Sequence, residues 1–285
     1  MNYLLLSVSM LSMILQNSIH NGIGINILKT DNDIYRFNEL TYIVCTILFL
    51  CMALGGALSL YSLGMGVLFG IFTLLSNAYK VKALSLGPMH ITILITTSSM
   101  IIPALSGVII FNETISISKI LAMIGLIGFI FLSAGEKNSN NTSMNKKWVL
   151  SCAITFFSMG AIGVMQKIHQ SSPHKDELFG FLCCSFALSF VYAFFTSRKS
   201  TLSIKKDIRV LPLVIISGIC TFVMNLLNLK LSGIIPSQIF FPTVNGGSII
   251  LSSICSVIIF KEKITKRQLI GLLGGLLSLI SICLL

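Results

Sequence analysis

Ten long apolar runs constrain this chain more than any other feature of its sequence. They are continuous rather than alternating, and they fall at residues 3–20, 39–57, 60–79, 88–111, 118–134, 148–168, 178–196, 209–229, 234–260 and 267–285. A helix needs about 20 mostly apolar residues to cross the hydrocarbon core of a bilayer. In lipid each backbone polar group must be satisfied within its own segment, which favours helices over the alternating strands of a barrel. The runs therefore predict an all-α integral membrane protein with ten transmembrane helices.

The composition agrees with a membrane protein and leaves no room for a soluble domain. Hydrophobic residues make up 54% and charged residues 10% of the 285 residues, whereas soluble domains carry about 25% charged residues. The net charge of +11 comes from short connectors, where lysine and arginine face anionic lipid, so we expect no nucleic-acid partner. The eight cysteines lie in apolar runs without metal-ligand spacing. We expect no disulfide, metal or cofactor, and the oligomeric state stays open.

Identical residues at a nearly constant offset indicate two related halves. The pairs are Gln16 and Gln166, Asn77 and Asn225, Lys82 and Lys230, Pro88 and Pro236, Glu113 and Glu262, and Gly125 and Gly274, all 148 to 150 residues apart. We predict a first five-helix repeat over residues 1–135, a polar connector over 136–147 and a second repeat over 148–285. Because five is odd, the second repeat must enter the membrane inverted. Inverted repeats are typical of secondary transporters, with a binding site near the midplane.

Three short motifs resemble a known family. Residues 83–88 (ALSLGP) lead into the fourth run, and the acidic turns 111–116 (FNETIS) and 260–265 (FKEKIT) each precede a glycine-containing final helix. With the ten predicted helices, these motifs are similar to the EamA-type transporters of the drug/metabolite transporter superfamily over essentially the whole chain. The resemblance implies transport of small metabolites, often outward. Two positions depart from the family pattern: Asn112 stands in place of a glycine, and the proline of the fourth helix is displaced to Pro103, so that helix should bend at a different height.

Lysine and arginine are unequally divided between the two sides of the predicted bundle. Connectors after odd-numbered runs hold 16 of the 20 cations, and the other side holds four. By the positive-inside rule the odd connectors are cytoplasmic and both termini lie outside the cytoplasm. We expect this multi-pass topology in the plasma (inner) membrane.

The positions of the carboxylates bear on the kind of solute. The nine acidic residues lie in connectors or close to the ends of runs. Exporters of the small multidrug type use a carboxylate in their first helix, where this chain has Gln16 and Asn17. Amides and hydroxyls instead favour a neutral or zwitterionic small molecule. The predicted substrate-binding residues are Gln16, Asn17, Asn77, Thr96, Thr97, Ser98, Gln166, Asn225, Thr243 and Asn245.

Several of these positions have two interpretations. Gln16 and Gln166 either line a pathway or hydrogen-bond one helix to another. Residues 242–248 (PTVNGGS) either form an interrupted helix beside a cavity or provide small residues for close packing. Glu113 is expected to tether its turn, and the pair Gly66 and Gly70 to pack helices.

The sequence thus predicts a secondary transporter, an exporter or facilitator, that works by alternating access. A small-multidrug-like cation exporter and a non-transporting membrane protein are the alternatives. We expect no enzyme, because no nucleophile with an acid–base pair and no metal cluster appears in the sequence.

Overall fold

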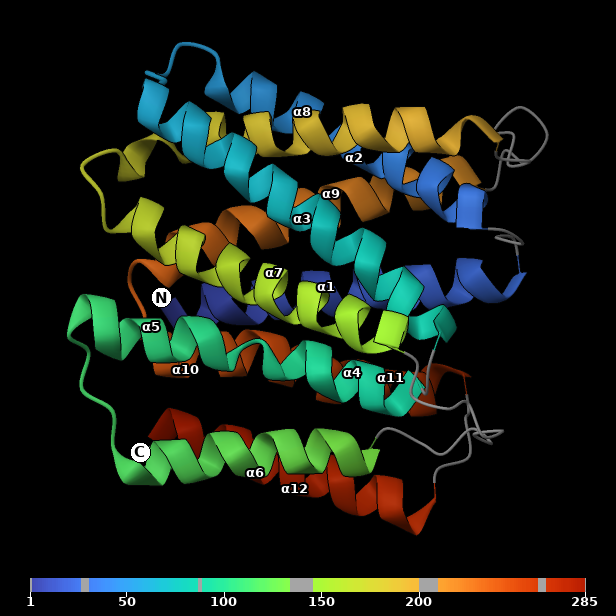
Figure 1. The fold of residues 1–285 in the computed structure, drawn as a ribbon, viewed down its shortest axis with the longest axis vertical. Coiled ribbons are helices and arrows are strands. Elements are labelled where there is room, and N and C mark those ends of the chain that lie inside the picture. Colours follow the sequence, from blue (N-terminus) through green and yellow to red (C-terminus); the bar gives the residue numbers. More distant parts are fainter. Residues whose placement is uncertain are drawn as a thin grey trace. The chain divides into compact units, whose positions relative to one another are not determined.

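The computed structural model describes residues 2–26, 31–86, 89–133, 146–199, 210–260 and 265–284. Every regular element in these ranges is helical (Figure 1). The chain folds as two compact units: unit 1 comprises Met1–Leu74 and Ile168–Leu231, and unit 2 comprises Leu75–Lys167 and Ser232–Leu285. Each unit therefore takes segments from both predicted halves of the sequence, and the helices that contain residues 74 and 167 contribute to both units.

Apart from the end of α7, unit 1 contains five helices or parts of helices and two single turns. They are α1 (Asn2–Asn26), α2 (Asp31–Ala53), the first part of α3 (Leu60–Leu86), the turn η1 (Lys175–Glu177), α8 (Leu178–Thr196), the turn η2 (Ser197–Lys199) and α9 (Val210–Ser232). The end of α7 also belongs to this unit.

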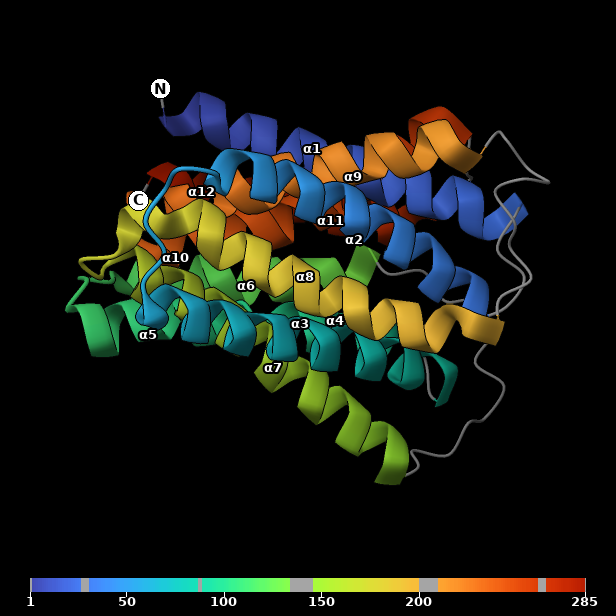
Figure 2. The same ribbon diagram turned by 90° about the horizontal axis from the view of Figure 1, so that it is seen from above.

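The helices of unit 1 pack through aromatic rings and small residues. α2 and α8 lie side by side (Figures 1 and 2), and the ring of Phe49 lies 5.6 Å from that of Phe186 across this contact. On α3, a Cβ at Gly66 would come within 2.6 Å of the carbonyl oxygen of Phe181. Ser185 donates a hydrogen bond of 2.8 Å to the carbonyl of Gly66. The predicted packing role of Gly66 is confirmed.

Unit 2 contains the rest of α3 and eight further elements. They are α4 (Met89–Ser98), α5 (Ile101–Phe111), α6 (Ile117–Ser133), α7 (Lys146–Gln170), α10 (Ser237–Phe241), the π-helix η3 (Pro242–Gly246), α11 (Gly247–Phe260) and α12 (Lys266–Leu284).

α6 and α12 form the most extensive helix pair of unit 2 (Figure 1). Their close approach depends on glycine, since a Cβ at Gly274 would lie 2.2 Å from the ring of Phe129. A Cβ at Gly125 would in turn lie 3.3 Å from the hydroxyl of Ser278. Small residues of this kind let helix backbones approach without a hydrophobic driving force.

Six helices among the described residues are long and apolar enough to cross a membrane. They are Tyr35–Ala53, Leu60–Lys80, Lys146–Gln170, Lys175–Thr196, Val210–Ser232 and Lys266–Leu284, and Ile95–Phe111 and Ile117–Leu132 are shorter apolar helical stretches. The predicted class, an all-helical protein with membrane-capable helices, is confirmed. The number of ten spans, their inversion and the boundaries of the two repeats stay predictions, and most of the predicted connector lies outside the described residues.

The start of the second helix differs from the prediction. α2 begins at Asp31 rather than at residue 39, so Asp33 and Glu39 lie inside it, and both are buried. Glu39 is paired with Arg36 one turn away and accepts a hydrogen bond from Ser197 at the end of α8. An acid that is paired in this way can be buried in a helix, which an apolar run does not reveal.

Candidate substrate-binding site

Amide and hydroxyl side chains join α1 to α9 in unit 1. Gln16 Nε2 donates to Thr221 Oγ1 at 2.7 Å, and Ser9 Oγ donates to Asn228 Oδ1 at 2.5 Å. Asn225 Nδ2 donates to the carbonyl of Thr221 at 2.8 Å. We call these five residues the α1–α9 seam. Through Thr221, the seam brings together the predicted site residues Gln16 and Asn225.

Within the α1–α9 seam, the bond between Gln16 and Thr221 lies near the middle of both helices. Thr221 is buried and is the twelfth residue of the 23-residue α9, and Gln16 is half-buried and is the fifteenth residue of the 25-residue α1. In a helix that crosses a bilayer, such positions lie near the midplane. Asn17 is exposed, as expected for a residue about 100° further around α1 from Gln16.

In unit 2 the helix predicted over 88–111 is divided into α4 and α5. Pro103 has no N–H to donate to the carbonyl of Ser99 four residues earlier, and Ile102 donates to that carbonyl instead, at 3.0 Å. The N–H of Ser99 donates to the carbonyl of Thr96 at 3.3 Å, which is the three-residue spacing of a tightened turn. The helical hydrogen bonding is thus interrupted just before Pro103, and the predicted bend itself stays a prediction.

Three predicted site residues lie at the end of α4, just before this division. Thr96 and Thr97 are buried and Ser98 is half-buried. The hydroxyl of Thr96 donates to the carbonyl of Thr92 at 3.0 Å. The hydroxyl of Thr92 accepts a hydrogen bond of 2.9 Å from Nε1 of Trp148, which holds α4 against α7.

A second interruption occurs between α10 and α11, where the π-helix η3 inserts one extra residue per turn. The N–H of Gly247 donates to the carbonyls of both Thr243 and Val244. Thr243 is buried with its hydroxyl 3.6 Å from Cys283 Sγ, and Asn245 is half-buried. π-bulges are frequent at functional sites. The predicted interruption of residues 242–248 is therefore present.

Close packing also occurs in the same stretch. A Cβ at Gly246 would lie 2.7 Å from a methyl of Leu126 on α6. Gly246 thus fits the packing interpretation of residues 242–248, and a cavity beside the interruption stays a prediction.

One face of α7 is closed by direct packing on α5 and α10. A Cβ at Gly160 would lie 2.3 Å from Ile102, and one at Gly163 would lie 2.8 Å from Pro103 and 3.0 Å from Phe241. Residues three and four apart share a helix face, so Lys167 continues the face that contains Gly163.

Lys167 forms an ion pair that the sequence analysis did not predict. Its Nζ lies 2.8 Å from Glu113 Oε1, with the two side chains 8% and 15% exposed. Glu113 also accepts hydrogen bonds from the backbone N–H of Ser237 at 2.7 Å and from its hydroxyl at 3.2 Å. Glu113 therefore tethers its turn to the start of α10, as expected, and to α7 as well. Its predicted counterpart Glu262 lies outside the described residues.

A polar cluster in unit 1 fixes the turn between α7 and α8. His169 is fully buried, with Nε2 3.1 Å from Ser62 Oγ. His174 Nδ1 lies 2.9 Å from Glu177 Oε1, and Glu177 Oε2 accepts from the N–H of Ser59 at 2.8 Å and from its hydroxyl at 2.6 Å. Across the ranges that the structure describes, no three or more His, Cys, Asp or Glu side chains are grouped to hold a metal ion.

The ten predicted site residues are divided between the two units. Gln16, Asn17 and Asn225 belong to unit 1, and the other seven belong to unit 2. Among the latter, Gln166 is buried beside Lys167, and Asn77 is exposed on α3. Their role in substrate binding stays a prediction. Thr221, which connects two of them, was not among the predicted residues, although it lies one helical turn from Asn225 in the sequence.

These features define an all-helical protein with membrane-capable helices, two of its helical segments being interrupted near polar residues. Residues 146–284, just under half of the chain, match the EamA-like transporter family. The match confirms the resemblance to EamA-type transporters of the drug/metabolite transporter superfamily. The family and the apolar helices support a membrane transporter rather than an enzyme.

Two further comparisons concern longer stretches. Over 189 residues the chain is 28% identical to an uncharacterized protein of Haemophilus influenzae strain Rd, covering 62% of this chain and 60% of that protein. The match thus spans less than two thirds of that relative. A solved crystal structure is similar with a TM-score of 0.70 at 14% identity, covering 98% of each chain. At that identity the likeness shows a shared fold alone.

Proposed function

We propose that this chain is a secondary transporter that moves a small neutral or zwitterionic metabolite across the plasma membrane by alternating access. Its ten transmembrane helices form two inverted five-helix repeats, and the connectors after odd-numbered helices face the cytoplasm. Both termini then lie on the opposite side.

The observation that carries the proposal is that unit 1 has uncharged polar groups at mid-helix and unit 2 has two interrupted helical segments. Gln16 and Thr221 meet near the middle of α1 and α9. The division at Ser99 and the π-helix Pro242–Gly246 fall within segments 89–111 and 237–260. Secondary transporters bind their substrates near the midplane, at discontinuous helices of this kind.

The two interruptions also support the repeat. The segments 88–111 and 234–260 are counterparts at the offset that relates the paired residues of the two halves. Each contains a proline, Pro103 or Pro242, and each is interrupted. A shared interruption in counterpart segments is expected if both halves descend from one five-helix unit.

The charges favour an uncharged or zwitterionic solute over a cation. Among the described residues, Glu39 is paired with Arg36, Glu113 with Lys167, and Glu177 with His174. Glu113 and Glu177 lie in turns, and Glu39 is the ninth residue of the 23-residue α2 but is already paired. A cation exporter needs a carboxylate that binds substrate and proton in turn.

Transport by the purified protein in liposomes is the direct test. We expect counterflow of one class among labelled neutral amino acids, nucleosides and vitamins, with no requirement for an inward proton gradient. Exchange of lipophilic cations for protons would instead establish the multidrug alternative. Movement of no solute in either direction would establish the non-transporting alternative.

The orientation has a test of its own. A reporter that is active only in the cytoplasm, fused after the last residue, should be inactive, and the same reporter inserted between α8 and α9 should be active. The reverse pattern would overturn the positive-inside assignment.

A further inference from the structure

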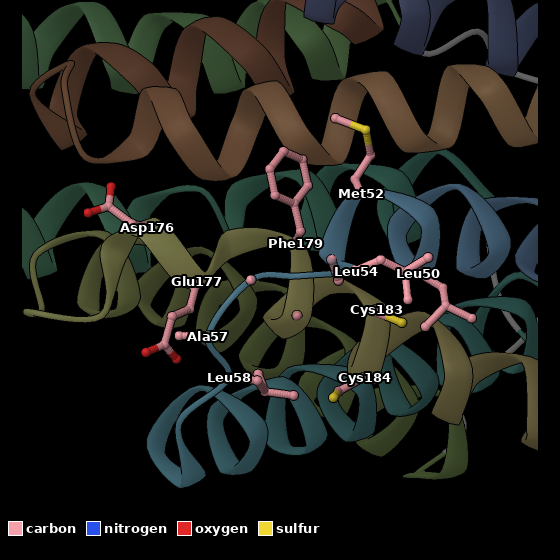
Figure 3. A pocket seen from close by; sticks show the side chains of 13 residues that line it. Leu50, Met52, Leu54, Ala57, Leu58, Asp176, Glu177, Phe179, Cys183 and Cys184 are labelled. Atoms are coloured by element: carbon pink, nitrogen blue, oxygen red, sulfur yellow. The ribbon is translucent and has the colours of Figure 1, made fainter.

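An apolar groove opens on unit 1 between the end of α2 and the first half of α8 (Figure 3). Its volume is about 400 Å³, within the range of about 300–1,000 Å³ that holds small ligands. Leu58 and Gly180 both line the groove, and a Cβ at Gly180 would lie 2.6 Å from a methyl of Leu58. The glycine at this position therefore lets Leu58 pack directly on α8.

The groove changes from polar to apolar along its length. In Figure 3 the carboxylates of Asp176 and Glu177 lie toward one end, and Leu50 and the thiols of Cys183 and Cys184 lie toward the other. A span of seven residues corresponds to about 10 Å along a helix. If the span Lys175–Thr196 crosses the bilayer, Asp176 lies at headgroup level and Cys183 lies within the hydrocarbon.

The wall on the α2 side exposes large apolar side chains. Leu50, Met52 and Leu54 are 51%, 53% and 74% exposed, and all three line the groove. Beside a bilayer, these side chains give an acyl chain direct access from the lipid.

The two acidic residues at the polar end differ in how accessible their carboxylates are to a ligand. Glu177 lines the groove, and its carboxylate is already bound by Ser59 and His174. Asp176 is exposed, and Lys175 beside it is exposed as well. An anion and a cation on adjacent residues match a headgroup that carries both an ammonium and a phosphate.

We propose that this groove binds a phospholipid with a primary ammonium headgroup, namely phosphatidylethanolamine. The ammonium donates to Asp176, the phosphate lies near Lys175, and one acyl chain occupies the apolar end beside Cys183 and Cys184. Phosphatidylcholine has no N–H to donate, and phosphatidylglycerol has no cation. The carboxylate of Asp176 therefore selects among lipids that share the same acyl chains.

Lipid retention by the purified, delipidated full chain tests the proposal without any transport assay. The three phospholipids, with identical acyl chains, are added in detergent, and bound lipid is counted by native mass spectrometry. Phosphatidylethanolamine should be retained at about tenfold lower concentration than the others, the difference expected for one hydrogen bond to a charged group.

Variants locate the site. Asp176→Asn should bring phosphatidylethanolamine to the level of phosphatidylcholine, Asp176→Glu should keep the preference, and Ala57→Phe should weaken retention of all three by filling the groove. The melting temperature of each lipid-free variant checks that it is folded. Equal retention of the three lipids, or a preference that persists in Asp176→Asn, would overturn the proposal.

Discussion

The ammonium of Lys167 lies 2.8 Å from a carboxylate oxygen of Glu113, which joins the end of α7 to the turn after α5. Both side chains are largely buried, and the same carboxylate holds the first N–H of α10. Three segments that are distant in the sequence therefore depend on one ion pair.

Removing one partner of this pair should be costly. Lys167→Met leaves Glu113 without its cation, and we expect a loss of about 3 kcal/mol in the free energy of unfolding, at the low end of the range for a broken buried pair because Ser237 still binds Glu113. The measurement is unfolding in mixed micelles titrated with a denaturing detergent. In Lys167→Met with Glu113→Gln the loss should be smaller than the sum of the two single losses. Additive losses would show that the two groups do not interact.

Two glycines of α3 form a matched pair for testing the contact with α8. A Cβ at Gly66 would lie 2.6 Å from the backbone oxygen of Phe181, whereas a Cβ at Gly64 would meet nothing within 4 Å. Gly66→Ala should destabilise the protein by about 1–3 kcal/mol because backbone must move. Gly64→Ala should change stability by less than about 1 kcal/mol. Similar stabilities of the two variants would contradict the close approach of α3 and α8.

The single tryptophan of the chain reports on the contact between α4 and α7. Trp148 is 2% exposed and donates to the hydroxyl of Thr92. Its fluorescence emission should be that of a buried indole. Thr92→Val should leave the indole N–H without this acceptor, at a cost of about 1–3 kcal/mol, and shift the emission. Thr196→Val, which removes a hydroxyl that bonds only within α8, is the control and should leave the emission unchanged.

The α1–α9 seam should matter for transport if the proposed function is right. Thr221→Val keeps the shape of the side chain and removes the hydroxyl that accepts from Gln16. Once a transported solute is known, we expect its rate to fall by about tenfold or more in Thr221→Val and in Gln16→Leu. Ser7→Ala on α1 removes an exposed hydroxyl that bonds within its own helix, and transport should be retained. Full activity of both seam variants would show that the seam contributes to helix packing and not to transport.

The helices were predictable because apolar runs must form internally bonded segments in lipid. The division near Pro103 was also predictable, since proline removes one donor from the helix. The early start of α2 was not, because Asp33 looks like a connector residue, and Glu39 like the edge of a run, until their burial is known.

The site was only partly predictable for a similar reason. A sequence shows that Gln16, Gln166 and Asn225 are polar residues in apolar runs, but it does not show which of them meet. The bond between Gln16 and Thr221 depends on the rotation of α1 and α9 about their own axes. The pairing of Lys167 with Glu113 depends on the packing of α7, which follows from glycines that accept Ile102 and Pro103.

The π-helix has a consequence for the helix that follows it. An extra residue in one turn rotates everything after it by about 100° about the axis. In the observed rotation Ile250 is fully buried, and a Cβ at Gly275 of α12 would lie 2.2 Å from it. Deleting one residue from Pro242–Gly246 would therefore turn the buried side of α11 away from α12. The π-helix therefore sets the rotation of α11 about its own axis, and this rotation decides which side chains of α11 face the protein interior and which face its surface.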